Sequence, residues 1–174
     1  GFFIAMKQVA LLFLVLLYPI SSFCQGYENT IIFGYAGGSI SPNDDEFGLN
    51  VLTFSDGSLQ ISDNQASELF FNDTDAAISG KNGKLLFYFN GIDIYDATHK
   101  PMLNGSLLNP YNATGYDLPQ GGIIIPYPGK SGKYILFHAQ EGYIAPWGVA
   151  NIGVYYSVVD MSLNNGLGRV TQRK

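Results

Sequence analysis

The chain has 174 residues, of which 47% are hydrophobic and 14% aromatic, and its formal net charge is −5. This length and composition suit one folded β-rich domain and exclude a disordered chain, which would be poor in aromatic residues. Nucleic-acid binding is also disfavoured, because phosphate groups require a basic protein surface.

The N-terminal segment has the pattern of a secretory signal peptide. Lys7 precedes the apolar run Val9 to Tyr18, and small residues follow it. That run is much shorter than the ~20 residues of a membrane-spanning helix. We therefore predict a hydrophobic signal helix over residues 1–24, with residues 1–5 as an upstream extension; an uncleaved anchor and a buried helix are the alternatives. The expected location is secreted or outer cell surface, with export machinery and membrane contacted only through this segment.

Cys24 is the only cysteine and lies at the predicted cleavage site. The mature residues 25–174 therefore have no disulfide and no cysteine-based metal site. A lipid-modified Cys24 is disfavoured, because Phe23 stands where such sites have a small residue.

Strand signals dominate the chain after residue 30. Two apolar runs flank Asp56-Gly57 in residues 49–62, and three flank Asn82-Gly83 and Asn90-Gly91 in residues 76–96. Asn-Gly and Asp-Gly favour hairpin turns, because these residues tolerate the positive φ that such turns need. Both faces of the run 85–89 are apolar, which predicts a strand covered on both sides.

Four more strands are predicted in succession, at about 122–127, 134–139, 153–160 and 167–172. The turns between them include Gly129 to Gly132 and Asn165-Gly166. A four-stranded antiparallel meander of this size resembles one blade of a β-propeller.

The predicted fold class is thus all-β, built from antiparallel four-stranded meanders and preceded by the signal helix. About nine strands make a partial β-propeller of about two blades, whereas a closed propeller needs ~4–8. Residues 25–174 are therefore expected to be the incomplete N-terminal part of a propeller-like domain. The alternative is a complete small β-domain such as a sandwich.

Three stretches carry a resemblance to a known family: "ISGKNGKLLFYFNGIDIYDATHKPMLNG", "PQGGIIIPYPGKSGKYILFHA" and "YYSVVDMSLNNGLGRV". They resemble the N-terminal propeller-like region of large secreted proteins of Bacteroidota, and the similarity runs from about Ile31 to Arg169. In many of these proteins a C-terminal sorting domain directs export by the type IX secretion system. The resemblance implies a propeller fold and such export. The resemblance supplies no catalytic residues, and no sorting domain is evident in residues 1–174.

Two histidines are the first candidates for chemistry. His138 has Glu141 three residues further on, so the pair is a candidate general base or metal site, whereas the alternative is a hydrogen-bonded strand histidine. His99 lies in a loop and has the same two interpretations. A single histidine without a second ligand favours the structural interpretation in both cases.

Acidic residues give weaker candidates. Asp44, Asp45 and Glu46 cluster in one loop, and Asp73 and Asp75 alternate in another. Alternating oxygens on a loop can bind calcium. Neither loop has the glycine and closing glutamate of the twelve-residue calcium loop, so solvated turn residues are favoured.

Catalytic machinery is not evident, and we assign no catalytic, cofactor-binding or metal-binding residue and expect no cofactor. A glycosidase needs two carboxylates flanking a cleft, and the sequence alone does not bring Asp93, Asp96 and Glu141 together. Tyr143 and Trp147 are interpreted either as stacking groups for a sugar or peptide or as covers of a strand end.

The leading hypothesis is a non-enzymatic, secreted or cell-surface binding module. Its partner would be an extracellular protein or glycan, contacted by the loops at residues 97–121 and 140–152. A propeller-type glycoside hydrolase or other extracellular hydrolase is the alternative in the enzyme class.

Overall fold

The computed structural model describes the chain with gaps, as residues 26–34, 49–55, 57–65, 69–110, 112 and 115–174. The predicted signal helix over residues 1–24 lies outside the described residues. Within the described ranges, the helical elements are two short 3₁₀ turns, η1 (Gly26–Glu28) and η2 (Asn164–Gly166). Neither has the length or the apolar character to cross a membrane.

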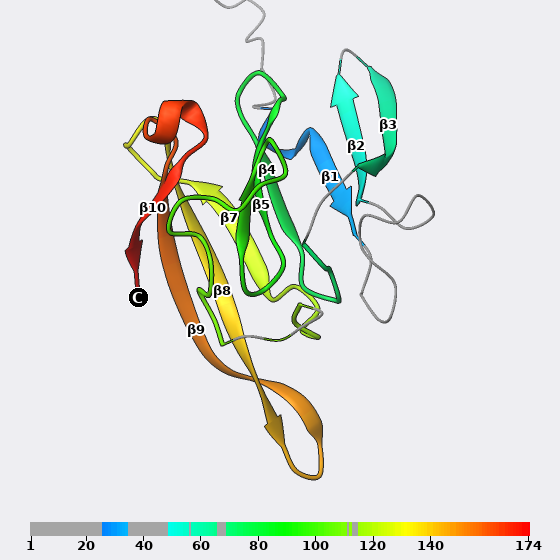
Figure 1. Ribbon diagram of the computed structural model, residues 1–174, viewed down its shortest axis with the longest axis vertical. Helices are drawn as coiled ribbons and strands as arrows, with labels where there is room; N and C mark the ends of the chain where they lie inside the picture. Colours follow the sequence, from blue (N-terminus) through cyan, green and yellow to red (C-terminus); the bar gives the residue numbers. More distant parts are fainter. Residues whose placement is uncertain (1–25, 35–48, 56, 66–68, 111, 113–114) are drawn as a thin grey trace, which may run out of the picture.

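The described strands form three antiparallel sheets, which confirms the all-β prediction (Figure 1). The first sheet contains β1 (Thr30–Phe33), β2 (Leu49–Ser55) and β3 (Ser58–Gln65). The second contains β4 (Ala76–Ser79), β5 (Leu85–Phe89) and β6 (Ile94–Asp96). The third contains β7 (Gly122–Pro126), β8 (Lys133–Ile144), β9 (Gly148–Asp160) and β10 (Arg169–Arg173). In every sheet, strands that follow one another in the chain are also neighbours in space.

Turn residues explain where these strands end. Ser55 pairs with Ser58 across a two-residue turn, and Gly57 there has a φ of +75°. Asn90 closes a longer connection, because its Oδ1 accepts hydrogen bonds from the backbone N–H groups of Ile92 (3.0 Å) and Asp93 (2.9 Å). Side-chain to backbone bonds of this kind are the reason that asparagine favours turns.

The second sheet is covered on both faces, as predicted for residues 85–89. Phe87 and Phe89 point to one side and join the core formed with the third sheet, whose members include Leu136 and Val159. Tyr88 points to the other side and packs with residues of the first sheet and with Phe71. All three β5 side chains have 0% exposure, so the three sheets are stacked face to face.

The predicted grouping into about two blades was wrong. Residues 49–65 and 76–96 belong to two different sheets, and β1, which the sequence reading did not count, completes the first. The physical reason lies in β5: a strand with apolar side chains on both faces needs a sheet on each side. The three described sheets do not close into a ring.

Both ends of the stack present apolar faces to solvent. The outward face of the first sheet, here called the first end face, comprises Ile31, Phe33, Phe54, Leu59 and Ile61, which are 42–58% exposed. The outward face of the third sheet, the second end face, comprises Ile123, Ile125, Ile135, Phe137 and Tyr156. Ile123 is 58% exposed.

A long hairpin projects from the third sheet (bottom of Figure 1). It consists of the parts of β8 and β9 that pair with each other beyond Gln140 and Gly153, and we call it the arm. The sequence reading assigned residues 140–152 to a loop, whereas most of them lie in these two strands. The strand pairing continues through Tyr143 and Val149, so the two strands extend to the tip of the arm.

The segment at residues 97–121 has no strand in its described part, as predicted, but it is firmly attached. Met102 and Tyr116 are each 2% exposed. The backbone N–H of Val170 in β10 donates to the carbonyl of Leu103, and that of Leu108 donates to Ile92. These contacts fix the segment against the second and third sheets.

Candidate functional site

His138 lies on the inward face of β8, in a buried polar cluster. Its Nδ1 is 3.0 Å from Oδ1 of Asn109, and its Nε2 is 3.3 Å from Oγ of Ser157 on β9. The ring also stacks near Tyr155 and lies beside Phe89. His138 is 3% exposed and Ser157 is 0% exposed.

Hydrogen bonding defines the protonation of this cluster. Asn109 donates both amide hydrogens, to the carbonyl of Gly91 (2.7 Å) and to that of Ala139 (2.9 Å), so its Oδ1 is an acceptor. His138 therefore carries its proton on Nδ1, and Nε2 accepts from the Ser157 hydroxyl. Burial lowers the pKa of His138 to about 4, which keeps the ring neutral.

Hydrogen bonds thus connect Ser157, His138 and Asn109 in the same sequence as the side chains of a hydrolase catalytic triad. However, the Ser157 hydroxyl is closed off from solvent, so no substrate carbonyl can reach it. The cluster satisfies buried polar groups and ties residue 109 to β8 and β9. The structural interpretation of His138 is therefore favoured by the geometry. Sequence reasoning missed Asn109 and Ser157, because both are distant in sequence and have no local motif.

Glu141 does not join His138. Its Oε1 accepts from Nδ2 of Asn112 (2.7 Å), and its Oε2 accepts from the backbone N–H of Asp117 (2.8 Å). The strand register shifts between Gln140 and Glu141, which carries this carboxylate toward the 112–117 segment. Glu141 therefore anchors that segment at the base of the arm. The hypothesis that His138 and Glu141 together form a general base or metal site is wrong.

His99 contacts the second sheet. Its Nδ1 is 3.1 Å from the hydroxyl oxygen of Tyr88, and the two rings lie 5.8 Å apart. Burial lowers the pKa of His99, and the nearby Asp96 opposes that shift. This histidine packs against a core tyrosine, which favours the structural interpretation.

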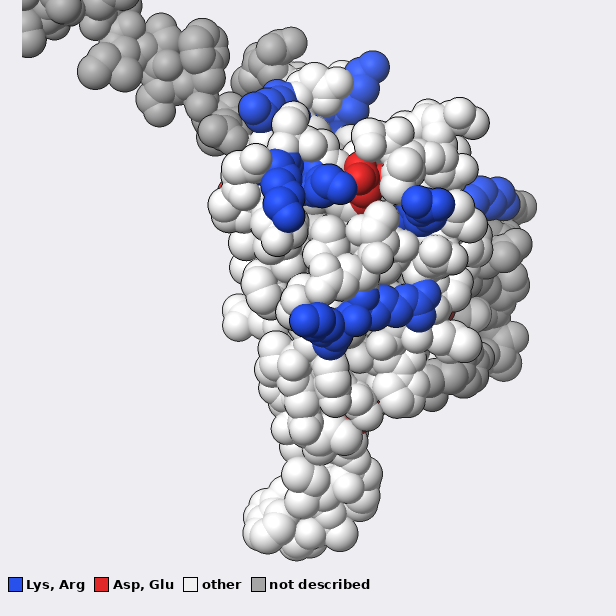
Figure 2. All heavy atoms as spheres, turned by 90° about the vertical axis from the view of Figure 1, so that its left-hand side faces the viewer, with Lys and Arg blue, Asp and Glu red and all other residues white. Residues whose placement is uncertain are grey.

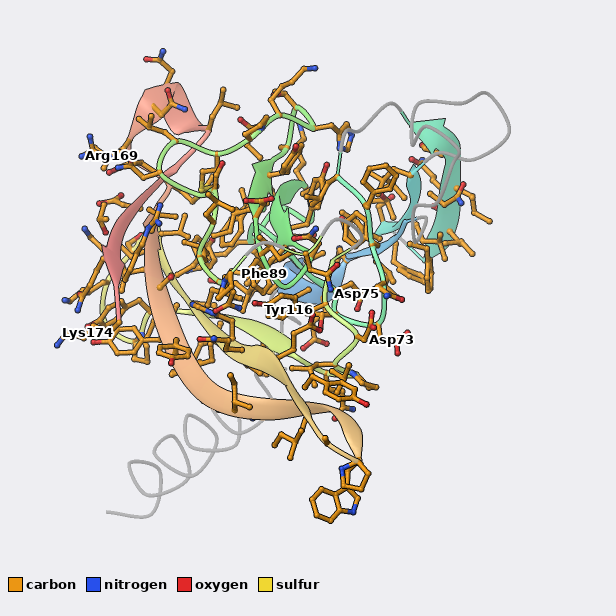
Figure 3. The ribbon with its side chains drawn as sticks, turned by 60° about the horizontal axis from the view of Figure 1, so that its bottom comes forward. Asp73, Asp75, Phe89, Tyr116, Arg169 and Lys174 are labelled. Carbon is orange, nitrogen blue, oxygen red and sulfur yellow. The ribbon has the colours of Figure 1, made fainter. Side chains whose placement is uncertain are left out.

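The acidic candidates that lie among the described residues are not part of a metal centre. Asp73 and Asp75 are exposed, and the described residues contain no group of three histidine, cysteine or carboxylate side chains that could hold a metal ion. Asp44, Asp45 and Glu46 lie outside the described residues. Although the Asp75 side chain is exposed, the protein around it partly desolvates the carboxylate and raises its pKa, against a smaller opposing effect of its backbone hydrogen bond. In Figure 3 the labelled Asp73 and Asp75 lie near one another at the edge of the molecule.

The carboxylates considered for glycosidase chemistry have structural partners. Asp93 Oδ1 accepts from the backbone N–H of Leu107 (2.7 Å). Asp96 is buried, and its Oδ1 accepts from both the backbone N–H (2.7 Å) and the hydroxyl (2.6 Å) of Thr98. Asp93, Asp96 and Glu141 therefore each stabilise a loop through hydrogen bonds.

Tyr143 and Trp147 occupy the end of the arm. Tyr143 is 75% exposed and Trp147 is 82% exposed. They therefore do not cover a strand end, and that interpretation is wrong. Within the arm Glu141 is the one ionisable group besides Tyr143, and Figure 2 shows the projection as an almost uncharged surface.

Comparison with known proteins identifies no relative of the chain. No protein-family model, no curated protein and no solved structure matches the chain.

Proposed function

We propose that this chain is the N-terminal part of a secreted or surface-attached propeller-type binding module without enzymatic activity. The observation that carries the proposal is the stack of three antiparallel sheets with apolar faces at both ends. Propeller blades bury such faces against their neighbours, so further sheets would cover the two end faces. The resemblance of residues 31–169 to secreted Bacteroidota proteins supports export, including the type IX route.

The arm supports the binding role. An exposed aromatic and aliphatic surface is a common feature of protein and glycan contacts, because aromatic side chains contribute large buried areas on binding. Trp147 lies in the turn between β8 and β9, and Tyr143 pairs with Val149 next to it. Figure 1 shows this end of the hairpin projecting away from the stacked sheets. The segment at residues 97–121 braces its base through Glu141.

The hydrolase alternative has less support. A glycosidase needs two carboxylates free to face one sugar. Asp93, Asp96 and Glu141 each accept structural hydrogen bonds instead. A complete small β-domain is the third possibility, and it requires that the end faces tolerate solvent.

The end faces provide the test. The full chain is purified, and its self-association and its binding of a hydrophobic fluorescent dye are measured. We expect both to occur, and Phe54→Lys on the first end face and Phe137→Lys on the second should reduce both while leaving the melting temperature nearly unchanged. A dye-silent monomer that melts sharply would contradict the proposal and favour the complete β-domain.

A second check is genomic. The reading frame beyond Lys174 is expected to encode further pairs of short strands separated by Gly- and Asn-containing turns. A stop codon directly after Lys174 would contradict the N-terminal assignment.

A further inference from the structure

An open pocket lies around the β7–β8 turn, at one end of the third sheet. Its volume is about 540 Å³. The side chains that matter for its chemistry come from three parts of the chain: Tyr27, Lys81, Tyr127, Lys130, Lys133 and Tyr134. The sequence alone does not indicate this site, because its lysines lie in or beside segments that are predicted only to form hairpin turns.

The pocket is basic although the chain is acidic. Three lysines line it, and no carboxylate is among the described residues that form its wall. Lys133 is neutralised from outside the pocket, because its Nζ lies 2.5 Å from Oδ2 of Asp160. Among the described residues Lys81 has no carboxylate partner, and Nζ of Lys130 lies 4.2 Å from the centroid of the Tyr127 ring. Figure 2 shows lysine and arginine side chains gathered on this side of the molecule around one acidic group.

The pocket also offers neutral hydrogen-bonding groups. Tyr27 and Tyr134 meet edge to face with ring centroids 6.3 Å apart. Within the described part of the chain neither hydroxyl is hydrogen-bonded to the protein. Burial, and to a smaller extent the neighbouring Tyr27, raises the pKa of Tyr134, so its hydroxyl stays protonated and able to donate.

The turn that carries the lysines is held in shape before any ligand arrives. Gly129 and Gly132 have φ values of +72° and +71°, which side chains disfavour. The backbone N–H of Lys130 donates to Tyr127, and the N–H of Met161 donates to Gly132. A fixed turn reduces the entropy lost when a ligand binds.

We propose that this pocket binds an acidic sugar residue of an extracellular polysaccharide. Lys81 and Lys130 face its carboxylate or sulfate ester, and the hydroxyls of Tyr27 and Tyr134 hydrogen-bond its ring hydroxyls. This inference deepens the proposed binding function and rests on it. A sugar fits better than nucleic acid, because two ammonium groups without an ion-pair partner among the described residues suit one charge per ring, whereas a phosphate backbone needs an extended basic surface.

The test uses the full chain and calorimetric titration with short oligogalacturonates, with a sulfated galactan fragment as a second acidic probe. Neutral galacto-oligosaccharides of equal length are the uncharged control. We expect one or both acidic probes to bind more weakly as salt increases, and the neutral control to show no binding. The double variant Lys81→Gln/Lys130→Gln should lower affinity by at least about tenfold, as expected for two charge-assisted contacts.

A matched control separates the site from general attraction. Lys84→Gln/Lys100→Gln removes the same charge outside the pocket and should leave affinity within about twofold. Tyr134→Phe keeps the ring, removes the free hydroxyl and should weaken binding without unfolding the chain. The site assignment is overturned if neither acidic probe binds, if the control double variant loses as much affinity, or if single-stranded DNA or phosphatidylserine vesicles bind more tightly than the sugars. This readout is separate from the dye and self-association tests of the end faces, so either proposal can fail alone.

Discussion

Nδ1 of His138 on β8 lies 3.0 Å from Oδ1 of Asn109, which belongs to the long segment between β6 and β7. This contact joins the third sheet to a segment that has no strand in its described part. The two residues are 29 positions apart in sequence and both are buried. Burial of the His138 ring favours its neutral form, and this makes the stability of the fold dependent on pH.

Acidification should destabilise the chain well before its carboxylates titrate. In the unfolded chain His138 takes up a proton near pH 6.5, whereas in the folded state its pKa is about 4. The unfolded state therefore binds more protons between these values, so stability is full above pH 6.5 and falls as the pH drops toward 4. We expect a loss of about 2 kcal/mol in urea unfolding over this interval, less than the unscreened value because solvent attenuates the effect.

His138→Gln is the control for that experiment. It should be less stable at neutral pH and should show a smaller decrease on acidification. The decrease that remains should include His99, whose pKa is also lowered by burial. An unchanged pH profile in His138→Gln would show that another group is responsible.

Asn109→Ala should cost about 3 kcal/mol in the free energy of unfolding, because it leaves the Gly91 and Ala139 carbonyls and the His138 N–H without their partner. Ser157→Ala removes the hydroxyl that donates to Nε2 of His138 and should cost only about 1 kcal/mol. Equal effects of the two substitutions in thermal unfolding would argue against Asn109 as the centre of the cluster.

Because the central sheet is covered on both faces, truncation of Phe87 in that sheet should destabilise the chain much more than truncation of Phe54 on the first end face. Phe87→Ala removes a side chain with 0% exposure from between two sheets and should cost about 3–5 kcal/mol. Phe54→Ala removes a side chain that is 42% exposed on the first end face, and the expected cost is below about 1 kcal/mol in the isolated chain. Urea denaturation of both variants measures the difference. A large cost for Phe54→Ala would mean that the first end face is covered.

Two glycines with positive φ should respond differently to alanine. Gly91 has a φ of +99°, and an added Cβ would lie 2.6 Å from Cβ of the buried Tyr116. Gly91→Ala should therefore cost more than about 3 kcal/mol, from strain and from displacement of the tyrosine. Gly57 has a φ of +75° with open space around it, so Gly57→Ala should cost about 1 kcal/mol. Calorimetric melting of the pair compares the two costs, and equal shifts would contradict the close contact at Gly91.

Trp147 provides a fluorescence probe of the arm, since it is the only tryptophan. At 82% exposure its emission should already resemble that of the unfolded chain and should be readily quenched by acrylamide. Strand unfolding should therefore change the emission maximum very little. A strongly blue-shifted native spectrum would show that the arm tip is covered in solution.

Much of the local structure could be predicted from the sequence. The turn residues around Gly57, Gly83 and Gly132 placed the hairpins nearly correctly, because positive φ is a property of the single residue. Alternating apolar side chains in Leu85–Phe89 also indicated a strand covered on both sides, since a strand places successive side chains on opposite faces. By itself, the sequence determined that the described chain is all-β and where most of its hairpins turn.

Tertiary structure alone decided which strands share a sheet and which polar groups meet. The hairpins at residues 49–65 and 76–96 separated into two sheets because β5 needs cover on both faces, and the short β1 joined the first. His138 found Asn109 rather than the nearby Glu141, and Lys81 reached the turn of Lys130, because packing brings together groups that no local spacing relates. Backbone preferences act between adjacent residues, whereas burial selects partners from the whole chain, and this is why the sites depended on the folded arrangement.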